Sequence, residues 1–210
     1  MTLLALLAII CFGFATYTCT MQLQPRHTTR SSAASHITRR ESTKSMKLSE
    51  LMAGITPAPE YEGPVSADDY VLAIGLEGSE TGPDDYLVAQ EGITEHSGAL
   101  SAVTNDVTYI RSGPQNVKTG TTRTINLTGD RYAGDAFQDA LLAHKIKYGT
   151  GKTVIKPYVY FCMLTGKGEQ GLISIVIDED PSGAAGSNAG IKATLTAKGT
   201  PAEYTYSKSP

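Results

Sequence analysis

Apolar residues gather in short runs along this chain, and most runs have the length of a β-strand. Residues 70–76 (YVLAIGL) form a continuous apolar run, which is typical of a buried strand. Residues 172–177 (LISIVI) give the strongest strand signal, and residues 154–163 (VIKPYVYFCM) predict a further strand. Residues 191–197 (IKATLTA) alternate apolar and polar positions, which predicts a strand with one buried face. The pattern therefore favours antiparallel β-structure.

Two polar, glycine-containing segments interrupt this pattern and are expected to contain long mobile loops. We interpret residues 77–105 as a strand, a long loop and a strand, and residues 178–190 (DEDPSGAAGSNAG) as a flexible loop. Residues 107–110 and 119–127 flank the turn sequence SGPQN, which predicts an antiparallel pair of strands. Polar residues break the apolar alternation of 119–127, so this strand is expected to face water or a polar lumen.

One helix is predicted, over residues 135–147. Asp135 is placed to cap it, because a carboxylate can accept from the free N–H groups of a first turn. Apolar residues then recur at three- and four-residue spacing, and Gly149 and Gly151 end the helix. A single helix among many strands predicts a mainly β (α+β) fold, an antiparallel β-sandwich or partial barrel flanked by one α-helix.

The first 45 residues differ in composition from the rest. Residues 3–15 form an apolar run of signal-peptide length, but no Lys or Arg precedes Arg26, and the following stretch is basic and rich in Ser and Thr. This N-terminal extension is interpreted as a disordered tail, a targeting segment or a mis-assigned start, with a natural beginning at Met46. Residues 46–210 are the predicted β-domain.

Charge and cysteine content limit the functions that this domain can have. Residues 1–45 carry five Lys or Arg and one acid, whereas residues 46–210 carry 13 Lys or Arg against 20 Asp or Glu. An acidic domain argues against binding to the phosphate backbone of nucleic acids, which requires clustered basic side chains. Cys162 lies in an apolar run and is expected to be a buried structural thiol, and no Cys and His spacing indicates a metal site.

The sequence GTGKT at residues 149–153 looks like the end of a nucleotide-binding phosphate loop. The full pattern requires a glycine at position 146, where this chain has Ile146, and it requires a preceding strand and a following helix. The pattern here predicts the reverse order, a helix and then a strand. We therefore interpret these residues as a connection between helix and sheet, with Lys152 as a solvated or inter-subunit cation.

Candidate catalytic, cofactor and metal residues are not found. Asp178, Glu179 and Asp180 can in principle bind a hard cation, but a solvated acidic turn is favoured without the EF-hand spacing. His96 and His144 have no nucleophile or carboxylate partner that the sequence reveals, and no serine lies in a G-x-S-x-G elbow. We expect a protein that is not an enzyme and uses no cofactor.

Five longer motifs follow one another in the second half of the chain: TYIRSG, KTGTTRTINLTGDRYAGDAFQD, KYGTGKTV, YVYFCMLTGKGEQGLISIVI and IKATLTAKGTPAEYTYS. In this order of motifs, residues 46–210 resemble the major tail tube proteins of long-tailed, siphovirus-like bacteriophages and prophages. The resemblance is strongest over residues 107–206.

This resemblance implies a structural virion protein that assembles with itself into stacked hexameric rings, forming the conduit for genome delivery. It implies tape-measure, tail-terminator and baseplate or tail-tip proteins as partners, DNA that passes without specific binding, and assembly in the host cytoplasm into a virion tail. Candidate lumen residues on the predicted strands are Thr121, Arg123, Asn126 and Ser174. Candidate inter-subunit loop residues are Glu80, Asp84, Asp85, Asp178, Glu179 and Asp180.

Two other functions remain open from the sequence. A tube subunit of a contractile injection or secretion system would share the fold, and sheath and ATPase genes nearby would distinguish it from a phage tail protein. The apolar run at 3–15 leaves open an exported β-sandwich binding module. The native N-terminus decides this case, since a start at Met46 would exclude export by that segment.

Overall fold

The computed structural model describes residues 46–207, and the predicted N-terminal extension lies outside them. Three short α-helices occur in this part of the chain: α1 (Leu48–Leu51), α2 (Ala136–Leu141) and α3 (His144–Lys147). Single 3₁₀ turns η1, η2 and η3 occupy Ala67–Asp69, Pro83–Asp85 and Gly151–Val154. The strands are β1 (Tyr70–Ile74), β2 (Leu87–Val88), β3 (Ile93–Tyr109), β4 (Gly113–Asp130), β5 (Ile155–Cys162), β6 (Lys167–Ser182), β7 (Gly190–Ala197) and β8 (Ala202–Thr205).

All eight strands belong to one antiparallel sheet, which confirms the predicted mainly β fold. The strand order is β2-β1-β5-β6-β7-β4-β3, and β8 pairs with the first part of β6. No helix within residues 46–207 has the length and apolar character needed to cross a membrane.

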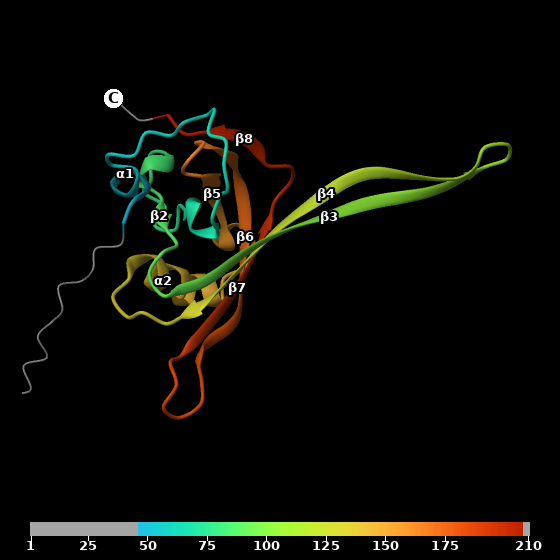
Figure 1. Cartoon of the computed structure of the whole chain (residues 1–210). Helices are drawn as coiled ribbons and strands as arrows, with labels where there is room; N and C mark the ends of the chain where they lie inside the picture. The colour runs from blue at the N-terminus through green and yellow to red at the C-terminus, as the bar shows by residue number, and fades with distance from the viewer. Residues whose placement is uncertain (1–45, 208–210) are drawn as a thin grey trace, which may run out of the picture. The chain divides into compact units, whose positions relative to one another are not determined.

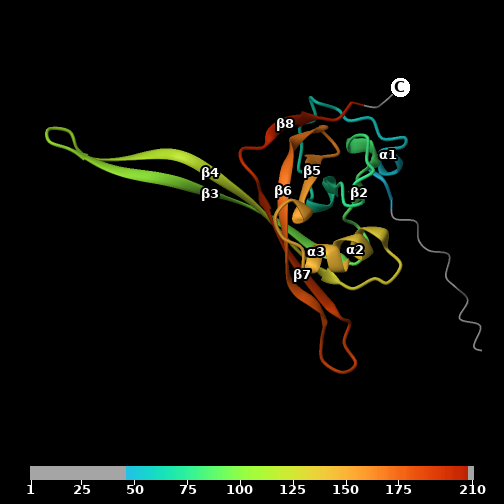
Figure 2. The same ribbon diagram turned by 180° about the vertical axis from the view of Figure 1, so that it is seen from behind.

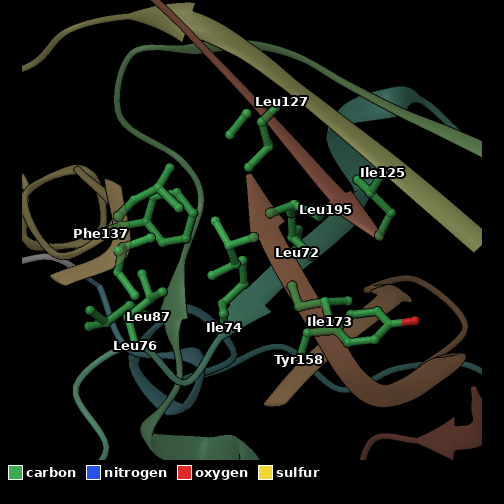
Figure 3. Packing of buried hydrophobic residues seen from close by; sticks show 14 residues of the cluster. Leu72, Ile74, Leu76, Leu87, Ile125, Leu127, Phe137, Tyr158, Ile173 and Leu195 are labelled. Atoms are coloured by element: carbon green, nitrogen blue, oxygen red, sulfur yellow. The ribbon is translucent and has the colours of Figure 1, made fainter. Parts of the chain in front are cut away.

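The sheet curves around a core formed by its concave face. Leu72 of β1 and Leu195 of β7 belong to one buried cluster, although β5 and β6 lie between their strands. Phe137 and Leu141 of α2 pack into the same cluster (Figure 3). This arrangement corresponds to the partial-barrel alternative, with α2 covering the concave face.

Strand β1 is buried on both faces, as its continuous apolar run predicts. Leu72 and Ile74 face the main core, whereas Val71 and Ala73 face a second cluster. Side chains on successive strand residues point to opposite faces, so both faces must be apolar. The second cluster also contains Leu48, Met52, Val88, Val159 and Phe161.

The predicted single helix over 135–147 is wrong, because the chain forms two short helices there. The Asp135 carboxylate does cap α2, accepting from the Gln138 N–H at 2.9 Å. The backbone of Ala143 is then extended, which separates α2 from α3. In one continuous helix Leu141 and Ile146 would point about 140° apart. The break therefore allows both side chains to reach the core, where each is almost fully buried.

The prediction of a long loop within 77–105 is also wrong for most of its length. Residues 93–105 belong to β3, which pairs with β4 from Ile93↔Gly129 to Tyr109↔Gly113. The predicted SGPQN turn is displaced, since β4 already begins at Gly113. Likewise β6 continues to Ser182, so the loop predicted over 178–190 is limited to residues 183–189.

Candidate assembly surfaces

The hairpin of β3 and β4 extends away from the rest of the β-domain. Both views show its two strands leaving the curved sheet together and ending in a tight turn (Figures 1 and 2). At about 3.3 Å per residue, the 17 residues of β3 span roughly 55 Å. We call the part beyond Ala99 and Thr124 the arm. Its residues are almost all exposed, so the arm has no core of its own.

Apolar side chains lie on the arm without cover from any other part of residues 46–207. Ile110 at the turn is fully exposed, Leu100 is 69% exposed and Tyr109 is 51% exposed. Val103 and Val117 are about half exposed. Scattered apolar residues are normal on protein surfaces, but a set gathered on one projecting element indicates an interaction surface.

Arg123 connects the base of the arm to strands β5 and β6 of the sheet. Its Nε donates to Glu169 Oε1 on β6 at 2.6 Å, and its guanidinium lies 5.2 Å from the ring centre of Tyr160 on β5. Gly98 on β3 leaves room for it, since a Cβ there would lie 2.4 Å from Arg123 Nη1. Burial raises the pKa of Tyr158, and the carboxylate of Glu169 beside it adds to this rise.

The four candidate lumen residues divide between two faces of the sheet. Thr121 and Arg123 lie on the side of β4 that carries Ile125 and Leu127, and the Arg123 side chain is buried. Asn126 lies on the opposite side. Ser174 pairs with Thr196, which in turn pairs with Thr124, so these residues share a face with Asn126. A position in a lumen stays a prediction for all four residues.

The convex face around Asn126 and Ser174 is polar but largely uncharged. We call this surface the outer polar face. Thr194 donates from Oγ1 to Asp178 Oδ2 at 2.5 Å and lies 3.3 Å from Asn126 Oδ1. Its residues on β4, β6 and β7 are Thr124, Asn126, Ser174, Thr194 and Thr196, together with the half-exposed Val176, which pairs with Thr194.

Two of the three acidic candidates at 80–85, Glu80 and Asp85, bind groups of their own chain. Asp85 accepts from Lys47 Nζ at 3.0 Å and from the Thr81 hydroxyl at 2.8 Å, and the Lys47 hydrogen bond is the main cause that lowers its pKa. Glu80 accepts from the backbone N–H groups of Glu77 and Gly78 at 2.7 and 2.8 Å. Asp84 lies in η2.

The candidates at 178–180 lie in β6 rather than in a loop, which corrects the sequence interpretation. Asp180 pairs with Lys147 of α3, and Glu179 lies 3.9 Å from Lys192 of β7. No group of three His, Cys, Asp or Glu side chains within residues 46–207 could hold a metal ion.

The GTGKT stretch connects α3 to β5 through η3, as the sequence predicts. Gly149 allows a close approach, since a Cβ there would lie 2.1 Å from the Lys145 carbonyl oxygen. Gly151 has a φ of 59°, which favours glycine. Lys152 is exposed on the following 3₁₀ turn.

Gln138 is a structural residue that the sequence interpretation missed. Its side chain is fully buried, and its Nε2 donates to the carbonyls of Glu91 (2.6 Å) and Asp130 (3.1 Å). Its Oε1 accepts from the Tyr132 N–H at 2.8 Å. Gln138 therefore joins α2 to the segments that lead into β3 and out of β4.

A cleft of about 300 Å³ opens beside the base of the arm, and we call it the basal cleft. Leu51 of α1, Val71 of β1, Val88 of β2 and Met163 supply apolar walls. The cleft is also lined by Asp68, Tyr70, Gln90 and His96. The Nδ1 atom of His96 is buried and has no hydrogen-bond partner within residues 46–207.

Two solved chains from gene transfer agent (GTA) particles have a similar fold. One comes from the tail of an empty particle determined with C6 symmetry, with a TM-score of 0.51 and 16% identity over 68% of this chain and 100% of that chain. The other comes from the virion of a native particle, with a TM-score of 0.50 and 15% identity over the same shares. No protein-family model and no curated protein matches the chain. At such identities the likeness establishes a shared fold.

Proposed function

We propose that this chain is a structural subunit of a phage-like tail tube, whose copies form six-membered rings that stack into a conduit for DNA. The observation that carries this proposal is the fold shared with GTA chains, which covers the whole of each matched chain. The empty GTA tail has C6 symmetry. A six-fold ring of this chain is the corresponding arrangement.

The arm supports self-assembly, because its apolar residues need a partner surface that residues 46–207 of its own copy do not provide. Leu100 and Ile110 are largely or fully exposed, and both lie on an element too thin to bury them. Another subunit would bury these side chains and contribute about 25 cal/mol per Å² of apolar surface removed from water. Ring closure would also cover the outer edge of β3, which has no neighbouring strand among residues 46–207.

The outer polar face supports a role as the lumen surface. Ser, Thr and Asn side chains hydrate well and carry no positive charge with which to hold phosphates. We place Asn126 and Ser174 toward the lumen, and Thr121 and Arg123 away from it. This assignment would let DNA slide without specific binding.

The proposed role is non-catalytic and virion-associated. Tape-measure, tail-terminator and baseplate or tail-tip proteins are the proposed partners of the assembled tube, with assembly in the host cytoplasm. A contractile-system tube subunit would use the same fold and the same arm, so gene neighbours distinguish the two.

Microscopy of the assembled state tests this function. The purified full-length chain is followed by sedimentation and negative-stain imaging over a range of protein and salt concentrations. Six-fold rings and stacked tubes are expected at high concentration. A strictly monomeric species under every condition would contradict the proposal.

A further inference from the structure

The basal cleft has the features of a receptor for one apolar side chain with a cation beside it. Its volume of about 300 Å³ corresponds to roughly ten water molecules, which leaves room for a branched aliphatic group. Leu51, Val71, Val88 and Met163 line it with apolar atoms. Asp68 supplies an exposed carboxylate, and no Lys or Arg lines the cleft.

The turn of the arm carries the complementary groups. Ile110 is fully exposed, and Tyr109 before it is half exposed. Arg111 follows directly and is exposed, and no acidic residue lies within 107–112. Neither Arg111 nor Asp68 forms an ion pair within residues 46–207, so both charges are available to a partner.

The two surfaces cannot meet within one copy. The arm is a continuously paired hairpin up to Tyr109↔Gly113, and both views show its turn far from α1 and β2, beside which the cleft lies (Figures 1 and 2). A rigid paired hairpin does not fold back onto its own base. The turn of one copy can therefore enter a basal cleft only if that cleft belongs to a second copy.

We propose that the arm turn of one copy, residues 109–112, inserts into the basal cleft of another copy, an inference that rests on the self-assembly proposed above. Ile110 enters between the apolar walls, and Arg111 pairs with Asp68. This contact joins two different surfaces of the same chain. Such heterologous contacts generate closed rings or open stacks rather than symmetric dimers, which is the geometry that a tube requires.

Charge reversal in the full-length chain tests this pairing. Arg111→Asp places two carboxylates together, and Asp68→Arg places two cations together. Like charges in contact cost several kcal/mol, and each 1.4 kcal/mol is a factor of ten in affinity. Each variant alone is expected to raise the concentration for half-assembly at least about tenfold. An equimolar mixture of the two variants restores the opposite-charge pairs and is expected to assemble near the wild-type concentration.

Matched controls separate this contact from general charge effects. Lys118→Asp changes the same charge on the arm away from its turn, and Glu62→Arg changes an exposed acid outside the cleft. Both are expected to assemble like the wild type. Ile110→Asp, which is fully solvated in the free chain, is expected to prevent assembly without lowering the melting temperature, and it keeps the test valid if Asp68→Arg fails to fold.

The outcomes distinguish this contact from the proposed function. If the wild type assembles and the Ile110→Asp or Arg111→Asp variant assembles equally well on its own, the proposed contact is overturned. The proposed tube function would still stand in that case. Single variants that fail without rescue in the mixture would overturn the pairing of Arg111 with Asp68. A wild type that never assembles would overturn both proposals.

Discussion

Arg123 links three strands through one guanidinium group, so its ion pair with Glu169 is expected to contribute to stability. The Arg123 side chain is 10% exposed and the Glu169 side chain 26% exposed. Glu169→Ala leaves a largely buried cation without its carboxylate. We expect the free energy of unfolding to fall by about 2 kcal/mol, less than for a fully buried pair because water reaches Glu169. Urea denaturation monitored by circular dichroism measures this loss.

The pair of Glu179 with Lys192 is the matched control, because it joins neighbouring strands at the surface. Its atoms are 3.9 Å apart, and its side chains are 46% and 56% exposed. Glu179→Ala is expected to cost less than about 0.5 kcal/mol. Equal losses of unfolding free energy in Glu169→Ala and Glu179→Ala would show that burial of the Arg123 ion pair adds nothing to stability.

The sequence predicts residue types for a polar surface but not the face on which each residue lies. Residues 119–127 are correctly predicted to be extended, yet Arg123 and Asn126 point to opposite sides of β4. The alternation of apolar and polar residues over 119–127 is obscured because a core-facing position is occupied by the charged Arg123. This is possible because Glu169 is its ion-pair partner. Gln138 is missed for the same reason: a buried polar side chain gives no apolar signal, and its partner Glu91 is 47 residues away in the sequence.

At the scale of elements, strands that bury side chains in their own core are predictable, whereas most of β3 is not, although residues 107–110 and 119–127 of the β3–β4 hairpin are correctly expected to be paired strands. β6 and β7 show apolar runs or alternation because Ile173, Ile175 and Leu195 pack in the main cluster. β3 is exposed along most of its length, so its sequence shows no alternation of apolar and polar residues. Its glycines and polar residues therefore resemble a loop. An element that is buried only by other subunits gives little hydrophobic pattern of this kind.

The base of the arm depends on a glycine at a close approach of two backbones. A Cβ on Gly129 would lie 2.3 Å from the Gly92 carbonyl oxygen and 2.9 Å from Ile93 Cα. Gly129→Ala must shift the backbone where β3 begins, and we expect a loss of about 1–3 kcal/mol. Thermal denaturation is expected to show a fall of several degrees.

Gly120→Ala provides the control on the same strand. The nearest atom to its added Cβ lies 3.8 Å away, which is an ordinary contact. Alanine also restricts the unfolded chain, so the melting temperature is expected to stay the same or rise slightly. Similar destabilisation by both substitutions would mean that any side chain added to β4 is harmful, and the close approach at Gly129 would not be the cause.

At the scale of the whole molecule, the described residues combine a domain that buries its own core with an arm that does not. The two buried clusters draw on β1, β2 and β4–β7 together with α1–α3, and no residue in either cluster comes from the arm beyond Ala99 and Thr124. Folding and assembly therefore depend on different residues. Loss of the exposed apolar residues or of the turn of the arm should alter association and leave the folded state nearly unchanged.

Removal of the arm tests this separation directly. Replacing residues 101–122 by Asn-Gly joins Leu100 to Arg123, which are already cross-strand partners, through a two-residue turn that suits antiparallel strands. The variant, which is otherwise full length, is expected to keep the circular dichroism spectrum of a folded β-protein. Its melting temperature is expected to lie within a few degrees of the wild-type value, since few buried contacts are lost. Sedimentation is expected to find only monomers at concentrations where the wild type forms rings. An unfolded product would show that the arm stabilises the domain, and tubes formed without the arm would show that assembly uses other surfaces.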